Sequence, residues 1–314
     1  MRIVSAEDLE GILTYDGLID ALAEAFRGEI AVPVRHHHTI PHPAADATLL
    51  LMPAWTESGA RFVGCKIVTV FPGNVQLGKP SVYGQYLLMS GDTGEPLALI
   101  DGRVLTAWRT AAASALAARY LAREDAAHLV MVGAGAMAPH LVRAHATVRP
   151  IRRVTLWNRT QSKAVALGFG LAVKGLEVDV TDNLEEAVKS ADIVSCATLS
   201  NRPLVRGDWL KKGAHLDLVG GFTPKMREAD DAAVRQARVF VDTRAGATKE
   251  AGDIVDPLKR RVIKKTDIHG DLFDLCRGKT KGRKTKSEIT LFKSVGTAIE
   301  DLAAAMLVWK RLQV

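Results

Sequence analysis

Short apolar runs alternate with stretches of helical spacing through the middle of the chain. Six such runs predict strands, near residues 128–132, 153–157, 176–180, 192–196, 214–218 and 238–242. Stretches whose apolar residues recur at helical spacing separate most of them. Regular alternation of strand and helix is typical of a doubly wound α/β fold, in which helices cover a parallel sheet. The pattern therefore predicts a Rossmann domain in this part of the chain.

The first hundred residues follow a different pattern. Ser5 and Asp8 resemble the start of a helix, and apolar residues then recur at helical spacing up to Gly28. Further apolar runs divided by turn residues predict antiparallel strands. These runs are 49–52, 62–70, 85–89 and 96–101. An alanine-rich helix from Val104 to Leu121 then connects this helix-and-sheet region to the Rossmann region.

The last segment begins with Ile289–Gly296 and continues as a helix to the C-terminus. The apolar stripe of this helix is Ile299, Leu302, Ala303, Met306 and Leu307. Since the segment follows the sixth predicted strand, we expect it to return to the first region. The expected organisation is a discontinuous α+β domain, residues 1–115 and 290–314, and a Rossmann domain, residues 116–289.

A glycine turn follows the first strand of the Rossmann region. In the sequence Gly-Ala-Gly-Ala-Met-Ala, Gly133 permits a tight turn and Gly135 lets the backbone approach a pyrophosphate. The small side chain of Ala138 allows the next helix to pack closely on the strand. Ala136 and Met137 complete the turn, and the N-terminus of the helix offers unpaired N–H groups to phosphates. We therefore expect a dinucleotide to bind here.

The second strand ends on Asn158, Arg159 and Thr160, and this end indicates which dinucleotide binds. An NAD site usually has an acidic residue here, which holds the ribose 2′-hydroxyl and repels a 2′-phosphate. A guanidinium group would instead bind that phosphate. NADPH is the preferred cofactor on this reasoning, with NADH also accepted. Alternatively, Arg159 lies only on the adenine or on the protein surface.

Composition and charge fit an enzyme and argue against other classes. The 314 residues are 47% hydrophobic and 25% charged, and the net charge is +7. Six basic residues lie between Arg277 and Lys286, but they lack interleaved aromatic residues and any nucleic-acid motif, so we interpret them as a solvated loop. The three cysteines show no CxxC spacing and suggest reduced thiols. The N-terminus has no signal-peptide pattern, and no apolar run suits a membrane, so we expect a cytoplasmic protein.

Three basic residues stand in apolar or small-residue surroundings: Arg35, Lys66 and Arg109. A buried cation is costly without a negative partner, and a substrate carboxylate would provide one. Otherwise these long side chains extend to solvent. The adjacent His36, His37 and His38 point alternately to opposite faces of an extended segment, so we expect no metal site there.

Together these stretches resemble the ornithine cyclodeaminase/mu-crystallin family over almost the full chain. The matching stretches are 63–66, 71–74, 101–112, 132–135, 218–221, 249–253 and 289–296. The resemblance implies a homodimer, with the dimer interface in the discontinuous domain. It also implies that Arg35, Lys66 and Arg109 bind a substrate carboxylate.

The resemblance implies further site residues. Arg109 also lies near the cofactor, and Ser81 occupies a hydroxyl position near the nicotinamide. The remaining expected cofactor contacts are Thr198, Val219, Gly220 and Ser294.

One departure from the family pattern is informative. Ornithine cyclodeaminases carry an aspartate after the Gly-Gly of the fifth strand, whereas this chain has Phe222. Cyclodeamination needs a positioned base, which phenylalanine does not supply. Reduction of a preformed cyclic imine needs only a held carboxylate, an aligned carbon and exclusion of water. Phe222 is expected to pack on the substrate ring.

We therefore expect an NADPH-dependent ketimine reductase. It would convert Δ1-pyrroline-2-carboxylate to L-proline, and Δ1-piperideine-2-carboxylate to L-pipecolate as a further candidate reaction. Lys66, or a water that it orders, is the expected proton source. Two alternatives stay open. One is a cyclodeaminase or alanine dehydrogenase that uses Asp217 or Glu228 as its acid, and the other is a non-catalytic NADPH-binding protein.

Overall fold

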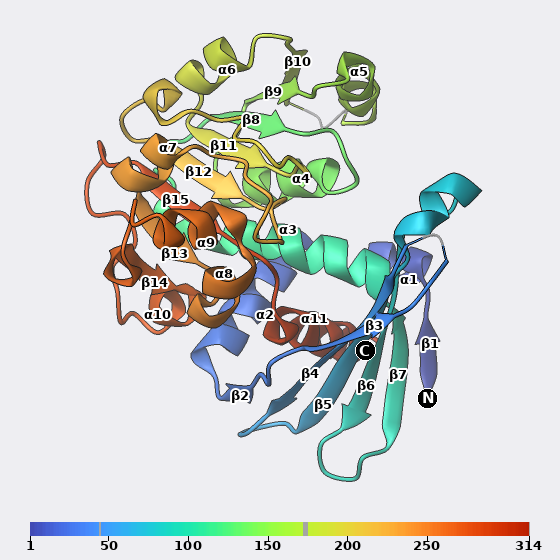
Figure 1. Cartoon of the computed structure of the whole chain (residues 1–314). Coiled ribbons are helices and arrows are strands. Elements are labelled where there is room, and N and C mark those ends of the chain that lie inside the picture. The colour runs from blue at the N-terminus through green and yellow to red at the C-terminus, as the bar shows by residue number, and fades with distance from the viewer. Residues whose placement is uncertain (44, 172–174, 314) are drawn as a thin grey trace. The chain divides into compact units, whose positions relative to one another are not determined.

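The computed structural model describes residues 1–43, 45–171 and 175–313 and contains two compact units (Figure 1). Unit 1 comprises Met1–Thr110 and Thr297–Val314, and unit 2 comprises Ala111–Gly296. The long helix α3 (Gly102–Leu121) begins in unit 1 and ends in unit 2. Unit 1 is thus built from two separate segments of the chain.

Unit 2 contains an eight-stranded sheet in which all pairings are parallel. Its order is β10-β9-β8-β11-β12-β15-β13-β14. The strands are β8 (His128–Val132), β9 (Arg153–Trp157), β10 (Glu177–Val180), β11 (Ile193–Cys196), β12 (His215–Leu218), β13 (Arg238–Val241), β14 (Ile268–Asp271) and β15 (Thr290–Lys293). The chain winds outward from β8 in one direction and from β11 in the other, which is the doubly wound arrangement. The predicted Rossmann fold is confirmed.

Helices cover this sheet on both faces (Figure 1). They are α4 (Ala138–Val148), α5 (Gln161–Gly170), α6 (Leu184–Ser190), α7 (Asp231–Gln236), α8 (Arg244–Glu250), α9 (Gly252–Lys259) and α10 (Leu272–Cys276), with 3-10 turns η2 (Gly207–Trp209) and η3 (Lys265–Asp267). The central strands β11 and β12 are fully buried, and β8 is buried except at His128, because helices pack on both faces of the sheet.

Two strands of this sheet differ from the sequence prediction. The segment Thr290–Lys293, expected in the first domain, forms β15 between β12 and β13. All four of its residues are buried, and Lys293 is accommodated because its Nζ donates to the Leu218 carbonyl at 3.0 Å. Only the helix after it lies in unit 1. The strand β14 was missed because His269 and Gly270 interrupt its apolar pattern.

Unit 1 contains a mostly antiparallel sheet of order β1-β7-β6-β5-β4-β2, with β3 also paired to β4. The strands are β1 (Arg2–Val4), β2 (Ile30–Ala31), β3 (His36–Ile40), β4 (Ala47–Thr56), β5 (Phe62–Val70), β6 (Val82–Ser90) and β7 (Pro96–Asp101), and η1 (Pro72–Leu77) is a 3-10 turn. Only β1 runs parallel to its neighbour, β7. The predicted N-terminal helix is divided at Leu13 into α1 (Ala6–Ile12) and α2 (Tyr15–Arg27). Its predicted start is confirmed, since the Ser5 hydroxyl accepts from the Asp8 N–H at 3.1 Å.

The two faces of this sheet have different surroundings. The C-terminal helix α11 (Ala298–Arg311) packs on β4, β5 and β6 and on α2. Alternate residues facing these helices are buried, including Met52, Lys66, Tyr86 and Ile100. Because side chains alternate along a strand, the intervening residues point to the opposite face. That face is partly exposed and largely apolar.

Candidate functional site

A cavity of about 300 Å³ lies in unit 2 at the carboxyl ends of β8, β9 and β11. It is lined by Gly133, Ala134, Gly135, Trp157, Asn158, Arg159, Thr160, Lys163, Ala197, Thr198, Leu199, Ser200 and Leu204. The winding of the sheet reverses between β8 and β11, and ligands of doubly wound folds bind at such a switch point. We call this cavity the dinucleotide pocket.

The glycine turn has the geometry that the sequence predicts. Gly133 adopts φ 109°, and a Cβ there would lie 2.7 Å from the Ala197 carbonyl oxygen. A Cβ on Gly135 would meet no atom within 4 Å, so its backbone faces open space. The N–H of Ala134 donates to Asn158 Oδ1 at 3.2 Å, which ties the turn to the end of β9. A pyrophosphate could approach this backbone closely.

Two cations line the same pocket beside the carboxyl end of β9. Arg159 was expected from the sequence, whereas Lys163, on the first turn of α5, was missed. Lys163 carried no signal of its own in the sequence, because Arg159 precedes the N-cap of α5 and the two cations do not share a helical surface. The exposed Leu199 was also missed and offers an apolar contact in the pocket.

Glu228 joins the loops that follow β11 and β12. Its buried carboxylate accepts from Thr198 N at 2.7 Å and Thr198 Oγ1 at 2.8 Å, and from Gly220 N at 2.8 Å and Gly221 N at 3.3 Å. Burial raises its pKa to about 7, assisted by the Asp253 carboxylate, while Lys293 and the Thr198 hydrogen bonds oppose the shift. Glu228 therefore fixes one wall of the dinucleotide pocket while remaining titratable near neutral pH.

Other expected cofactor residues lie near the pocket but do not line it. Ala136 and Met137 form the turn before α4. Val219 and Gly220 follow β12, and Ser294 follows β15, so these three share the carboxyl edge of the sheet with the pocket. Ser294 Oγ is buried and has no hydrogen-bond partner within the described part of the chain. Its free hydroxyl suits a polar ligand group.

Unit 1 contains a buried cluster of charges centred on Lys66 and Arg109. Lys66 Nζ lies 2.8 Å from Asp301 Oδ2 and donates to Thr106 Oγ1 at 3.3 Å. Arg109 Nε donates to Asp301 Oδ1 at 2.9 Å, and its Nη1 donates to Glu300 Oε2 at 2.6 Å. Neither carboxylate was predicted from the sequence. The partners of the two cations are thus side chains of α11, whereas a substrate carboxylate had been expected.

The environment of Lys66 changes its acidity. Burial and the like charge of Arg109 lower its pKa to about 8, while the Asp301 carboxylate opposes the shift. A lysine with this pKa exchanges protons near neutral pH, as a general acid requires. The charges of Asp301 and Glu300 raise the pKa of Arg109 despite its burial, so Arg109 stays protonated. The cluster therefore combines a fixed cation with a titratable one.

The remaining expected substrate residues lie on separate segments. Arg35 is half-buried just before β3, and Ser81 is half-buried just before β6. Phe222 belongs to unit 2, where it is 51% exposed on the loop after β12. The histidines 36–38 are exposed on β3. Within the described residues, no group of three or more His, Cys, Asp or Glu could hold a metal ion.

The two alternative acids are both engaged by hydrogen bonds. Asp217 is fully buried and accepts from Ser114 Oγ at 3.0 Å and Ser195 Oγ at 2.7 Å, and it lies 3.1 Å from His145 Nε2. Burial opposes ionisation of Asp217, but the interactions with His145 and Ser195 outweigh it and lower the pKa. Glu228 binds backbone N–H groups as described above. Neither carboxylate replaces the aspartate of the cyclodeaminases at position 222.

The model of the ornithine cyclodeaminase/mu-crystallin family matches residues 2–314. The chain belongs to this family. It is 38% identical over 317 residues to the Δ1-pyrroline-2-carboxylate reductase of Colwellia psychrerythraea, with 99% of both chains covered. The resemblance seen in the sequence is confirmed.

Solved structures give the same relationship. The Δ1-pyrroline-2-carboxylate reductase of Thermococcus litoralis in complex with NADH and L-proline superposes with a TM-score of 0.92 at 36% identity, covering 100% of this chain and 98% of that one. An archaeal alanine dehydrogenase dimer with bound NAD superposes with a TM-score of 0.91 at 29% identity, covering 100% and 96%. Fold similarity alone does not separate these two reactions.

In the described part of this chain, no helix is long and apolar enough to cross a membrane.

Proposed function

We propose that this protein reduces Δ1-pyrroline-2-carboxylate to L-proline with NADPH, and Δ1-piperideine-2-carboxylate to L-pipecolate by the same chemistry. The observation that carries the proposal is Phe222 on the loop after β12, in a chain 38% identical to a reductase of this imine. Phenylalanine supplies no base at the position where cyclodeaminases carry an aspartate, and the nearby carboxylates Asp217 and Glu228 are both engaged in hydrogen bonds. Reduction of a preformed imine does not require such a base.

The reaction needs a hydride and a proton. A bound dinucleotide would supply the hydride to the carbon of the protonated C=N bond, and the electron pair of that bond would move to nitrogen to give a secondary amine. We assign to Lys66 the supply of the proton, directly or through a water, because its pKa of about 8 lets it donate near neutral pH. Arg109 and Arg35 hold the substrate carboxylate, and Ser81 lies near the nicotinamide. Phe222 packs on the ring.

The preference for NADPH depends on Arg159 and Lys163. Two cations in one pocket favour the 2′-phosphate, because each charge-assisted hydrogen bond is worth about 1.5–3 kcal/mol. None of the described residues that line this pocket is a carboxylate that would repel that phosphate. The Thermococcus reductase structure contains NADH, and NADH is therefore expected as a weaker cofactor here. Gly133, Gly135, Ala136 and Met137 would hold the pyrophosphate, and Asn158, Thr160, Thr198, Val219, Gly220 and Ser294 the rest of the cofactor.

The first experiment follows NADPH absorbance with Δ1-pyrroline-2-carboxylate, and repeats it with NADH and with the six-membered imine. Turnover that favours NADPH supports the proposal and the role of Arg159. Ammonia release from ornithine and NAD, without imine reduction, would instead identify a cyclodeaminase. Tight NADPH binding without turnover of any imine would indicate a binding protein.

Lys66 provides the sharper test of mechanism. Lys66→Met should lower kcat by ~100-fold or more, as expected for loss of one preorganised polar group. Lys79→Met, which removes an exposed lysine of the same unit, is the matched control and should retain full activity. Near-normal turnover by Lys66→Met would remove this side chain from the mechanism.

We also propose a homodimer formed through the open face of the unit 1 sheet. Strand register brings apolar side chains together on that face: Ile3, Leu51, Trp55, Val63, Cys65, Ile67, Leu87, Met89 and Leu99. Ile67 is 40% exposed and Ile3 is 77% exposed. A continuous apolar sheet face of this kind marks a protein interface, and a second copy of the chain is the occupant that family membership favours.

A further inference from the structure

A second cavity of unit 2 is lined mainly by cations. It has a volume of about 420 Å³ and lies between the end of α3, the residue after α4 and the loop before β15. Six of its lining residues are basic: Arg119, Arg123, Arg149, Arg283, Lys284 and Lys286. Among the described residues that line it, the carboxylates are Glu124 and Asp125. Small-molecule sites typically measure about 300–1,000 Å³, so we call this cavity the basic pocket.

The basic pocket is separate from the dinucleotide pocket. Its residues 119–125 precede β8, and its residues 283–286 precede β15. The dinucleotide pocket instead follows the carboxyl ends of β8, β9 and β11. Because all strands of the sheet are parallel, the basic pocket lies at the amino ends of the strands and the dinucleotide pocket at their carboxyl ends. A dinucleotide bound in one leaves the other unfilled.

Two arginines of the pocket are fixed by the end of α3. Arg149 Nη2 donates to the carbonyls of Ala118 at 2.7 Å and Arg119 at 2.9 Å. Arg283 Nε donates to the Leu121 carbonyl at 2.7 Å. These carbonyls form the negative end of the helix dipole, which amounts to only about half an elementary charge. The backbone therefore orients the two guanidinium groups without neutralising them.

The electrostatic state of these arginines indicates a shortage of negative charge. Burial lowers the pKa of Arg283 to about 10, and the like charges of Arg123 and Arg149 add to the shift, although the Glu288 and Asp125 carboxylates oppose it. Burial and Arg119 also lower the pKa of Arg149, against the opposing charge of Glu124. The Nε of Arg149 is buried and, among the residues that the structure describes, has no hydrogen-bond partner. A bound anion would raise the pKa of both arginines and would give Arg149 Nε an acceptor.

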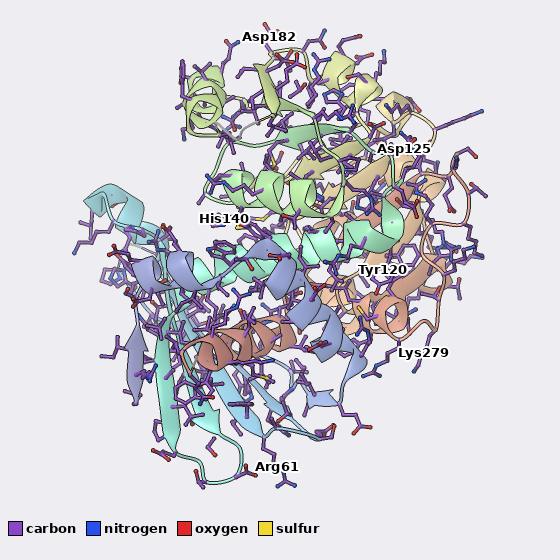
Figure 2. All side chains as sticks on the ribbon, turned by 180° about the vertical axis from the view of Figure 1, so that it is seen from behind. Arg61, Tyr120, Asp125, His140, Asp182 and Lys279 are labelled. Carbon is purple, nitrogen blue, oxygen red and sulfur yellow. The ribbon has the colours of Figure 1, made fainter. Side chains whose placement is uncertain are left out.

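We propose that the basic pocket binds a small molecule with clustered oxyanions, either phosphates or carboxylates. Guanidinium groups pair with both kinds of oxyanion through two parallel hydrogen bonds, and four of them line the pocket. One of the four, Arg123, already pairs with Asp125 at 3.0 Å and with Asp192 at 2.7 Å. Lys284 and Lys286 are exposed at its rim, where they attract an anion from solution. Tyr120 and Asp125, which also line the pocket, are labelled in Figure 2. The proposal does not depend on the reductase activity.

Calorimetric titration of the NADPH-saturated protein tests the proposal. Inorganic pyrophosphate and citrate, at constant ionic strength, represent the two ligand chemistries, and at least one should bind saturably to one site per chain. Lys284→Glu with Lys286→Glu should weaken that binding ~10-fold or more, since hydrogen bonds to charged groups are worth about 1.5–3 kcal/mol each. The matched control is Lys279→Glu with Lys281→Glu. It makes the same charge change in the same basic segment but outside the pocket, and should alter affinity less than twofold.

Three outcomes would overturn the proposal. The first is absence of saturable binding by either anion. The second is an equal loss of affinity in both double variants, which would show that the net charge of the protein, and not the pocket, controls binding. The third is unchanged binding in the Lys284/Lys286 variant, which would locate the anion elsewhere. Because the readout is heat of binding, a failure of imine turnover leaves the test intact.

Discussion

Lys66 lies in unit 1 between a like charge and two carboxylates, and its acidity follows from that position. If protonated Lys66 is the proton donor, kcat/KM should fall as the pH rises through about 8, where the ammonium group is lost. The Asp301 carboxylate raises the pKa of Lys66. Asp301→Asn should therefore lower that pKa and move the alkaline limb to lower pH. Steady-state rates across the neutral and alkaline range measure both effects.

Titration of the imine itself would also reduce the rate at high pH. A limb caused by the substrate would keep its position in Asp301→Asn, since the pKa of the free imine does not depend on the enzyme. An unmoved limb in this variant would therefore exclude Lys66 as the titrating group.

Glu228 makes a second prediction at the residue scale. Both oxygens of its ionised carboxylate accept hydrogen bonds, and protonation near pH 7 removes acceptor capacity from one of them. Below pH 7 the loops at Thr198 and Gly220 lose part of their support, so the KM for the cofactor should rise. Glu228→Gln should show a KM raised ~10-fold at every pH, consistent with loss of a hydrogen bond to a charged group. The measurement should use NADH, which has no titrating 2′-phosphate. If the cofactor KM of Glu228→Gln still rose below pH 7, as expected for the unsubstituted enzyme, Glu228 would not be the group that titrates.

Residues with local roles were predictable from the sequence, and residues with distant partners were not. The turn at Gly133 and the position of Arg159 follow from spacing after a strand. In the sequence, Asp301 and Glu300 are simply two acidic residues in the first turn of a helix. Only the fold brings Asp301 to Lys66, which lies 235 positions away in the chain. Glu228 likewise has no local motif, because its donors come from two separate loops.

At the scale of elements, α11 combines a core face with a charged site. The predicted stripe is confirmed in part, since Ile299, Leu302 and Ala303 are buried, whereas Met306 and Leu307 are half-buried. Periodicity identified this helix, but the same reasoning misplaced the strand before it. The segment Thr290–Lys293 is too short for its pattern to distinguish one sheet from another, and only the pairing with β12 and β13 decides.

The two roles of α11 should separate in mutants. Leu302→Ala leaves a cavity beneath a fully buried side chain and should lower the free energy of unfolding by about 2–5 kcal/mol. Activity well below the unfolding temperature should be retained, because Leu302 belongs to the core stripe. Urea unfolding and steady-state assays on the same samples measure both quantities. Lys310→Ala, at an exposed site on the same helix, should change stability by less than ~0.5 kcal/mol. Equal effects of the two substitutions would show that the stripe does not stabilise unit 1.

At the scale of the whole molecule, the open face of the unit 1 sheet determines the proposed oligomeric state. Alternation along β5 places Lys66 toward α11 and Ile67 on the open face, so one strand serves both the charge cluster and the interface. Ile67→Glu should convert the dimer to a monomer, because an unpaired carboxylate is costly in an apolar contact.

Size-exclusion chromatography with light scattering gives the molecular mass. The control, Phe169→Glu, adds the same charge at an 83% exposed apolar residue of unit 2 and should leave the mass unchanged. If Ile67→Glu remained a dimer, the interface would lie on another surface. If the unmodified protein were a monomer, the apolar face would need a different occupant. A monomer that kept full activity would further show that the charge cluster around Lys66 works without a second copy.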